Sequence, residues 1–311
     1  MTELDATVSP IDPATRTWSI LPPAGVRSLP KYDDGWVRED GIREAFLAYI
    51  EDDPSVNWSD QLEALHEESS RTHFLDRWTR AAIVERIGPP TASPVIVDLG
   101  CSTGYLLEDL HAAFPESDLI GIDLVAVGLR KAHDALPAAR LLQADACALP
   151  LADACVDAVV SANLLEHIRD DETVLREIRR VLRPGGTAVI VVPAAPSTYD
   201  YYDRFLGHVR RYARGELASK CMAVNLEPLE DVHLAALLYP VFWLVKQHNR
   251  RRYGELDGSE LEARVAANIS NTRDSRTGVL AWRLERRLLR AGVRLPFGIR
   301  SLVVARRGAG A

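Results

Sequence analysis

The sequence predicts an α/β protein built on a doubly wound, mostly parallel sheet of seven strands. From residue 95 onward, short apolar runs alternate with helical segments, which is the pattern of βαβ units in a parallel sheet. Two of these runs, Val95–Val97 and Ala188–Val192, are continuously apolar, as expected for strands buried on both faces. The 311 residues are 47% hydrophobic and 26% charged, which is sufficient for a full core with additional structure around it.

The same alternation gives the expected order of elements. The turn formed by Pro184, Gly185 and Gly186 ends a helix and directs the chain into the next strand. Strands are expected at 95–99, 118–123, 140–144, 156–161, 187–192, 227–235 and 299–305. Helices are expected at 104–114, 126–136, 170–182 and 214–224, and residues 240–292 show helical periodicity.

Composition and periodicity divide the chain into four parts. Residues 1–30 contain five prolines and no sustained periodicity, which predicts an extended or disordered leader. Residues 31–90 are expected to form an N-terminal helical cap, because apolar residues within 42–50 and 74–83 recur at helical spacing. The other two parts are the core, expected at 91–239 and 293–307, and a helical insertion before the last strand, expected at 240–292.

Charge and cysteine content limit the compartment and the partners. Residues 1–90 carry 17 acidic and 9 basic side chains, whereas residues 240–311 carry 6 acidic and 15 basic ones. The basic end lacks the dense Lys/Arg block and interleaved aromatic residues of a nucleic-acid site, so nucleic acid is not an expected partner. The four cysteines show no CxxC spacing, and the chain has neither a signal-peptide core nor an apolar run of membrane-spanning length. These features predict a cytoplasmic protein without a structural metal.

The most informative stretch is a glycine loop between the first expected strand and the helix that follows it. Gly100 allows a sharp turn, and Gly104, four residues later, allows a bound ligand to approach the backbone closely. A dinucleotide site would have the spacing GxGxxG instead. Asp98 comes just before the loop, and an acid at this place suits a ligand with a cationic amine better than one with two phosphates.

Two further acids lie at the ends of the next two strands. Asp123, 19 residues after Gly104, is placed to accept hydrogen bonds from both hydroxyls of a ribose. Asp145 ends the third strand, where its carboxylate is placed to accept a hydrogen bond from an exocyclic amine. Together with the glycine loop, these acids predict a binding site for a nucleoside that carries an amine.

Residues 95–192 resemble class I S-adenosylmethionine-dependent methyltransferases of the type 11 kind. The glycine loop, Asp123 and Asp145 carry this resemblance, with the turn Asn163-Leu164-Leu165-Glu166-His167 and the segment Val181-Leu182-Arg183-Pro184-Gly185-Gly186. One departure is Ser102, which stands where such loops often have a middle glycine.

The resemblance implies a Rossmann-like core and S-adenosyl-L-methionine as the cofactor. It places Gly100 and Gly104 beside the methionine part of the cofactor, Asp123 on the ribose and Asp145 facing the adenine. The full set of expected cofactor-binding residues is Asp98, Gly100, Ser102, Gly104, Asp123, Leu124, Asp145, Ala146 and Asn163.

Two segments contain candidates for the chemistry. Glu166 and His167 follow the fourth strand, at the edge of the sheet where ligands bind, and His167 is a candidate base. The alternative is that this pair shapes the cofactor pocket or caps the next helix.

The second segment, Ser197 to Tyr212, is rich in Tyr, His, Asp and Arg and resembles a Y-D-x-x-D…G-H-x-R-R-Y pattern of bacterial methyltransferases. The pattern implies His208 as the best candidate base, with Tyr201 and Tyr212 shaping the pocket. Together with His167 of the first segment, His208 and Tyr201 are the catalytic candidates. The alternative is an ion-paired lid in which aspartates neutralise the arginines, and no metal is expected on Asp200, Asp203 and His208. The expected substrate-binding residues are Tyr199, Tyr202, Arg210, Arg211 and Tyr212.

The function that this pattern predicts is methyl transfer to oxygen or carbon of a small molecule, such as a secondary-metabolite or glycan/lipid intermediate. One alternative is a lipid-linked substrate at the membrane surface, and another is a cofactor-binding partner protein without transferase activity. The apolar run Leu237–Val245, followed by Lys246 and Arg250–Arg252, would dock on an anionic membrane, pack in the core or form a homodimer contact.

Overall fold

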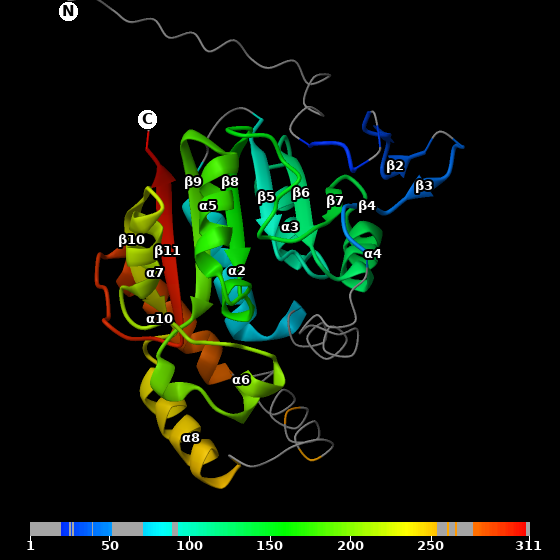
Figure 1. Ribbon diagram of the computed structural model, residues 1–311. Coiled ribbons are helices and arrows are strands. Elements are labelled where there is room, and N and C mark those ends of the chain that lie inside the picture. The colour runs from blue at the N-terminus through cyan, green and yellow to red at the C-terminus, as the bar shows by residue number, and fades with distance from the viewer. Residues whose placement is uncertain are drawn as a thin grey trace, which may run out of the picture.

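Figure 1 shows the computed structural model of the chain, which describes residues 20–24, 26, 28–38, 40–51, 71–88, 93–253, 260, 265 and 276–308. A sheet of eight strands forms the centre, in the spatial order β10-β11-β9-β8-β5-β6-β7-β4. Its strands in chain order are β4 (Phe46–Ala48), β5 (Val95–Leu99), β6 (Asp118–Asp123), β7 (Arg140–Gln143), β8 (Val156–Ala162), β9 (Leu182–Pro193), β10 (Leu226–Leu234) and β11 (Arg300–Arg307).

The predicted α/β class and the seven predicted strands are confirmed. All strands from β4 to β9 pair in parallel, and β11 runs antiparallel to both of its neighbours, β9 and β10. β4 adds an eighth strand at the edge, beside β7. β9 begins earlier than expected, because Pro184, Gly185 and Gly186 remain within the strand where its register against β8 shifts.

Helices cover both faces of the sheet, so the strands are buried on both sides (Figure 1). In β5, the side chains of Val95, Val97 and Leu99 belong to one core cluster and that of Ile96 to the other. This alternation is the period of two of a strand. The first cluster includes α5 (Asp171–Val181) and α7 (Glu216–Ala223), and the second includes α2 (Phe74–Ile87), α3 (Tyr105–Ala113) and α4 (Ala126–Ala135).

The helix expected within 42–50 is wrong, because this stretch forms strands. β3 (Arg43–Glu44) belongs to a small antiparallel sheet with β1 (Lys31–Tyr32) and β2 (Trp36–Val37), and β4 then joins the main sheet. The physical reason is the open edge of β7: Phe46 of β4 pairs with Leu141, and the buried indole of Trp36 donates to the Leu141 carbonyl at 3.0 Å. These long-range hydrogen bonds outweigh a local helical spacing.

The loop region beyond the carboxyl ends of β8 and β9 carries η3 (Pro196–Thr198), α6 (Tyr201–Phe205) and α8 (Tyr239–Arg252) (Figure 1). α8 and α10 (Arg276–Arg290) come between β10 and β11 in the chain, which confirms helices in this stretch. Most of the stretch between these two helices lies outside the described residues. So do residues 1–19 of the expected leader and 52–70 of the expected cap.

Gly104 permits the close approach of α3 to α4. It stands just before α3 with a φ of 84°, a left-handed conformation that L side chains rarely adopt. A Cβ atom at this position would lie 2.9 Å from the Cβ of Ala132 in α4 and 3.1 Å from its Cα. Backbone strain and a steric clash therefore both require glycine here.

We expect Gly104→Ala to lower the free energy of unfolding by about 2 kcal/mol or more, because it adds the clash to the cost of a left-handed backbone. Gly215→Ala is the matched control, since Gly215 stands before α7 with a φ of 73° and no atom within 4 Å of its Cβ position. It should lose only about 1 kcal/mol. Urea unfolding measures both values, and equal losses would contradict the packing argument.

Candidate functional site

The candidate site lies at the carboxyl edge of the parallel strands, where the loops after β5, β6, β7, β8 and β9 meet. Binding sites of open α/β sheets form at this edge, because loops from neighbouring strands converge there. The loop after β5 and the loop after β8 touch, since a Cβ on Gly100 would lie 3.2 Å from the Cβ of Leu164. The glycine loop is therefore in contact with the loop that leads into Glu166 and His167.

The glycine loop is held open by positive φ angles and backbone hydrogen bonds. Gly100 has a φ of 82°, and its amide donates to the carbonyl of Ile122 in β6 at 2.8 Å. Ser102, the residue in place of a middle glycine, also has a positive φ, of 46°. Its amide donates to the Asp123 carboxylate at 2.8 Å, so this acid fixes the loop. Serine therefore tolerates the conformation that the loop requires.

Asp98 is a buried carboxyl group at the base of this loop. Its side chain is 1% exposed, and neither oxygen has a hydrogen-bond partner among the described residues. Burial, with the nearby charge of Asp123, raises the pKa of Asp98 to about 8. A buried carboxyl group without a partner is costly, and a cationic amine would supply the missing partner.

The other predicted cofactor residues line the same edge. The Asp123 carboxylate also accepts from the Val125 amide at 2.9 Å, which fixes its orientation at the end of β6. Asp145, after β7, is exposed and accepts from the Cys147 amide at 2.8 Å. The remaining members are Leu124, whose carbonyl accepts from Gln143, buried Ala146, and Asn163, whose φ is 56°.

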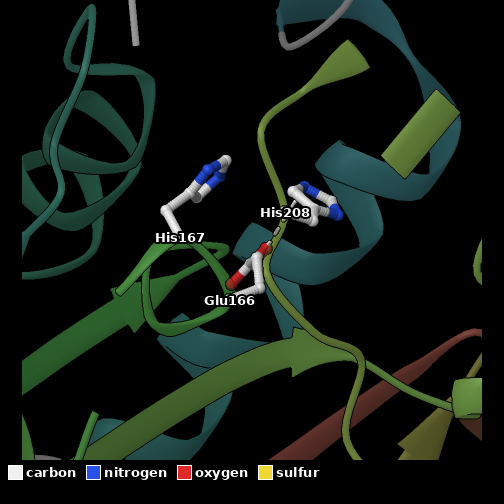
Figure 2. Close-up of side chains that lie close together, drawn as sticks. All are labelled: Glu166, His167 and His208. Carbon is white, nitrogen blue, oxygen red and sulfur yellow. Dashed lines mark ion pairs between the residues drawn. The ribbon is translucent and has the colours of Figure 1, made fainter. Parts of the chain in front are cut away.

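Glu166, His167 and His208 form a compact cluster (Figure 2). Glu166 and His167 belong to η2 (Leu165–His167), which follows β8, and His208 comes from the segment after α6. The imidazole rings of His167 and His208 meet edge to face at 4.8 Å between centroids. One potential ligand atom from each of the three residues lies within 4.8 Å of the others.

Glu166 is fully buried, and burial raises the pKa of its carboxyl group. Neither of its oxygens accepts a hydrogen bond within the described part of the chain, and His208 Nε2 is 3.9 Å away. The backbone fixes this approach, because the Val209 amide donates to the Glu166 carbonyl at 2.8 Å. The sequence drew attention to Glu166, but it gave no reason to separate a catalytic role from helix capping.

Asp203 fixes the other side of His208. Its buried carboxylate lies 2.9 Å from His208 Nδ1, 2.7 Å from Arg211 Nε and 3.6 Å from Lys246 Nζ. Although burial alone would raise the pKa of Asp203, the hydrogen bond to His208 and the two cations bring this pKa below its usual range. The ionised carboxylate orients the imidazole, so that Nε2 faces Glu166.

Lys246 and Asn249 are site residues that sequence reasoning missed. Both lie buried on the inner side of α8, where Lys246 Nζ is 2.6 Å and Asn249 Nδ2 is 3.2 Å from the Asp200 carboxylate. Asp200 and Asp203 also form a capping box at the start of α6. The available signal was a lysine and an asparagine three residues apart in an otherwise apolar and basic helix, which places both on one face.

The predicted substrate-binding residues lie in the same segment, and several of them have partners within the protein. Arg211 is 8% exposed and paired with Asp203, and Arg210 lies 3.1 Å from Asp171. Tyr212 is fully buried and donates to Asp171 at 2.7 Å. Of the ion-paired lid left open as an alternative, the structure has the pair of Asp203 and Arg211, whereas Asp200 pairs with Lys246 and Arg210 with Asp171 of α5. The roles of these residues toward a substrate therefore stay predictions.

The other three tyrosines of the segment, Tyr199, Tyr201 and Tyr202, differ in their burial and contacts. Tyr201, a catalytic candidate, is 2% exposed and meets Tyr253 edge to face at 5.8 Å, and Tyr202 is partly buried beside Lys246. Tyr199 donates to the His208 carbonyl at 2.7 Å and so helps to hold the loop that carries the imidazole. Of the predicted catalytic residues, the structure brings His167 and His208 together and gives Tyr201 a packing position.

The order of the sheet, the glycine loop after β5 and the acids at the ends of β6 and β7 define the class I S-adenosylmethionine-dependent methyltransferase architecture. Residues 97–190 match the family model described as a methyltransferase domain. Over these residues the chain is therefore similar to a methyltransferase domain.

Individual relatives agree with this assignment. Trans-aconitate 2-methyltransferase of Azoarcus sp. (strain BH72) is 37% identical over 122 residues, which cover 39% of this chain and 47% of that protein. Demethylmenaquinone methyltransferase of Thermus thermophilus is 36% identical over 119 residues, covering 37% of this chain and 53% of that protein. The chain thus spans about half the length of the curated relatives it matches.

The fold is also that of a solved structure, phosphoethanolamine N-methyltransferase 2 of Haemonchus contortus in complex with S-adenosyl-L-methionine. The two share a TM-score of 0.55 at 17% sequence identity, over 82% of this chain and 58% of that one. At this identity the likeness shows the fold alone.

We expect Lys246→Met to lower the free energy of unfolding by about 3–5 kcal/mol, because it leaves two buried carboxylates without their ammonium partner. Arg250→Met is the control on the same helix: Arg250 is exposed and donates to the Ser197 carbonyl. Its loss should stay within about 0.5 kcal/mol. Denaturant unfolding of both variants measures the difference, and a similar small loss in each would show that the buried network does not hold α8.

Proposed function

We propose that this protein transfers the methyl group of S-adenosyl-L-methionine to oxygen or carbon of a small-molecule acceptor. The observation that carries the proposal is Asp98, a buried carboxyl group at the base of a glycine loop, for which the described part of the chain offers no hydrogen-bond partner. The carboxylate would pair with the cofactor's ammonium group. Two relatives are named for small-molecule acceptors, trans-aconitate and demethylmenaquinone.

The bound cofactor would supply an electrophilic methyl group on a sulfonium, so the protein has mainly to bind and align. In the transfer, the acceptor atom forms a bond to the methyl carbon while the carbon–sulfur bond breaks, and its electron pair stays on sulfur. Asp98 would hold the ammonium group, Asp123 the ribose and Asp145 the adenine. Alignment of this kind lowers barriers by roughly 7–11 kcal/mol.

An acceptor hydroxyl must also lose its proton, and Glu166, His167 and His208 offer the place for this. The loop that leads into Glu166 and His167 contacts the glycine loop. Because Asp203 holds Nδ1 of His208, Nε2 of the same ring faces Glu166 within the cluster. His208 can serve there as the base or as a ligand of an ion that acidifies the hydroxyl, and either role uses the same cluster. Arg210, Arg211 and the tyrosines of 199–212 would shape the acceptor side.

The direct test is incubation of the purified protein with methyl-labelled S-adenosyl-L-methionine and a small-molecule extract of the producing organism. We expect S-adenosylhomocysteine to form and the label to appear in an extractable small molecule. Cofactor binding without any transfer would instead support the non-catalytic partner protein. A protein that binds neither S-adenosyl-L-methionine nor S-adenosylhomocysteine would overturn the proposal.

We expect the affinity for S-adenosyl-L-methionine to rise about tenfold between pH 6 and pH 7.5. The pKa of Asp98 is raised to about 8 in the free protein, so the carboxyl must lose its proton to pair with the ammonium group. The ligand's own amine, with an ordinary pKa of about 7.7–8.0, stays mostly charged over this range. Titration calorimetry measures the constants.

Asp98→Asn should bind the cofactor about tenfold more weakly at pH 7.5 and lose this pH dependence. Without cofactor, the variant should melt no lower than the parent at pH 7.5. The reason is that ionisation of a carboxyl whose pKa lies above the ordinary 3.8 opposes folding as the pH rises through this range. An unchanged pH profile in the variant would remove Asp98 from the cofactor site.

A second candidate function, methyl transfer to a lipid-linked acceptor at an anionic membrane surface, is favoured by α8. The helix buries its polar residues Lys246 and Asn249 and exposes apolar ones: Val241 66%, Trp243 39%, Leu244 61% and Val245 50%. Exposed arginines, Arg250 to Arg252, follow at its end. An apolar surface beside cations fits the interface of an anionic bilayer. Among the helices that the structure describes, none has the length and apolar composition to cross a bilayer.

We expect the protein to sediment with vesicles of phosphatidylcholine and phosphatidylserine, and Leu244→Glu to weaken this binding about tenfold. Met222→Glu is the control, since Met222 is 62% exposed on α7, away from the patch. If the protein does not sediment with these vesicles at low salt, the function at a membrane surface is excluded. A change of oligomeric state in Leu244→Glu would show that the patch is a contact between two copies of the chain.

A further inference from the structure

We propose that Glu166, His167 and His208 bind one divalent transition-metal ion of the zinc type. The proposal rests on the proposed function only for what the ion does, and on the geometry of these three side chains for its existence. It departs from the sequence expectation, which included no metal and which weighed Asp200 and Asp203, rather than Glu166 and His167, as partners of His208.

The first argument is the donor set. Two imidazoles and one carboxylate are the ligands of catalytic zinc and of other first-row divalent ions, whereas magnesium and calcium prefer sites made of oxygen ligands. The ligand atoms of Glu166, His167 and His208 lie within 4.8 Å of one another. Ligands around a tetrahedral ion with bonds of about 2.1 Å are about 3.4 Å apart, so the ligand atoms would have to approach one another by at most about 1.4 Å to complete the site.

The second argument is the carboxylate of Glu166. It is fully buried, neither of its oxygens accepts a hydrogen bond from the described residues, and it is directed at His208 (Figure 2). The 3.9 Å separation from His208 Nε2 is longer than a hydrogen bond. Leaving a carboxylate in this state is costly, and a cation held between it and the two imidazoles would remove the cost.

The third argument is the support behind His208. Its Nδ1 lies 2.9 Å from the Asp203 carboxylate, which is itself held by Arg211 at 2.7 Å. A carboxylate behind a ligating imidazole fixes the tautomer, presents the Nε2 lone pair to the ion and strengthens it as a ligand. Asp203, Arg211 and Lys246 are therefore positioning residues for the ion, because they act on it through His208.

The position of the cluster indicates what the bound ion would do. Three protein ligands leave coordination positions open, and the cluster adjoins the glycine loop through Leu164 and Gly100. An acceptor with an oxygen donor would be drawn to the cofactor's side of the sheet, and its hydroxyl would be acidified there. The inference therefore narrows the acceptor to a molecule that presents oxygen, a hydroxyl above all, to the ion.

The test is titration calorimetry with Zn²⁺ alone, on full-length protein freed of metal by a chelator. We expect one Zn²⁺ per chain, and binding weakened at least 100-fold in Glu166→Gln and in His208→Gln. His111→Gln, in α3 outside the cluster, is the matched control and should bind as the parent does. Mg²⁺ at the same concentration should not bind at this site.

A second measurement keeps the inference testable if a variant folds poorly. Co²⁺ should give the visible absorption of a four- or five-coordinate ion in the parent and lose it in Glu166→Gln, with circular dichroism checking the fold. No Zn²⁺ binding by the parent, or equal binding by the parent and Glu166→Gln, overturns the metal site. S-adenosylhomocysteine binding is measured separately, so a protein that binds the cofactor but no zinc keeps the proposed function, and the reverse result keeps the metal site alone.

Discussion

The buried carboxylate of Asp203 is the group on which the arrangement of the candidate site depends. It contacts His208, Arg211 and Lys246, and so connects the segment after α6 to α8, where Lys246 lies 43 residues after Asp203 in the chain. A buried charge is stable only when its partners are in place. The network therefore has a single satisfied arrangement, in which the His208 imidazole is fixed while the outer face of α8 remains apolar. One electrostatic requirement thus determines both the catalytic side of the site and the character of its outer surface.

The strands of the sheet could be predicted from the sequence because the residues that define each strand lie within it or next to it. Strands buried on both faces are continuous apolar runs, and the glycine loop, Asp98, Asp123 and Asp145 occur in a fixed order within about fifty residues. The N-terminal stretch could not be read in the same way. Residues 42–50 carry a helical spacing, and only the open edge of β7 and the bond from Trp36 to Leu141 make this stretch extended. Leu141 and the rest of β7, which favour the extended conformation, lie about a hundred positions away in the sequence.

The candidate site was only partly predictable, for the same reason. His167 and His208 were identified by residue type and by their place after strands, and the structure puts their rings 4.8 Å apart. Lys246 has the appearance of a surface residue in sequence, and its burial depends on Asp200 and Asp203. Glu166 acquires significance only from the absence of hydrogen bonds to its carboxylate, which is a property of the described surroundings rather than of the sequence. The predicted cofactor residues lie close together in the sequence, whereas the residues for the chemistry come from segments that are far apart in the sequence.

The most direct measurement of the central claim is a crystal structure of the protein with S-adenosylhomocysteine. We expect the amino group beside Asp98, the ribose on Asp123 and the sulfur facing the cluster of Glu166, His167 and His208. In S-adenosyl-L-methionine bound in the same way, the methyl group on this sulfur would face the cluster, which includes His208 held by Asp203. A ligand bound elsewhere, or bound in the loop with its sulfur directed away from this cluster, would contradict the site described for this protein.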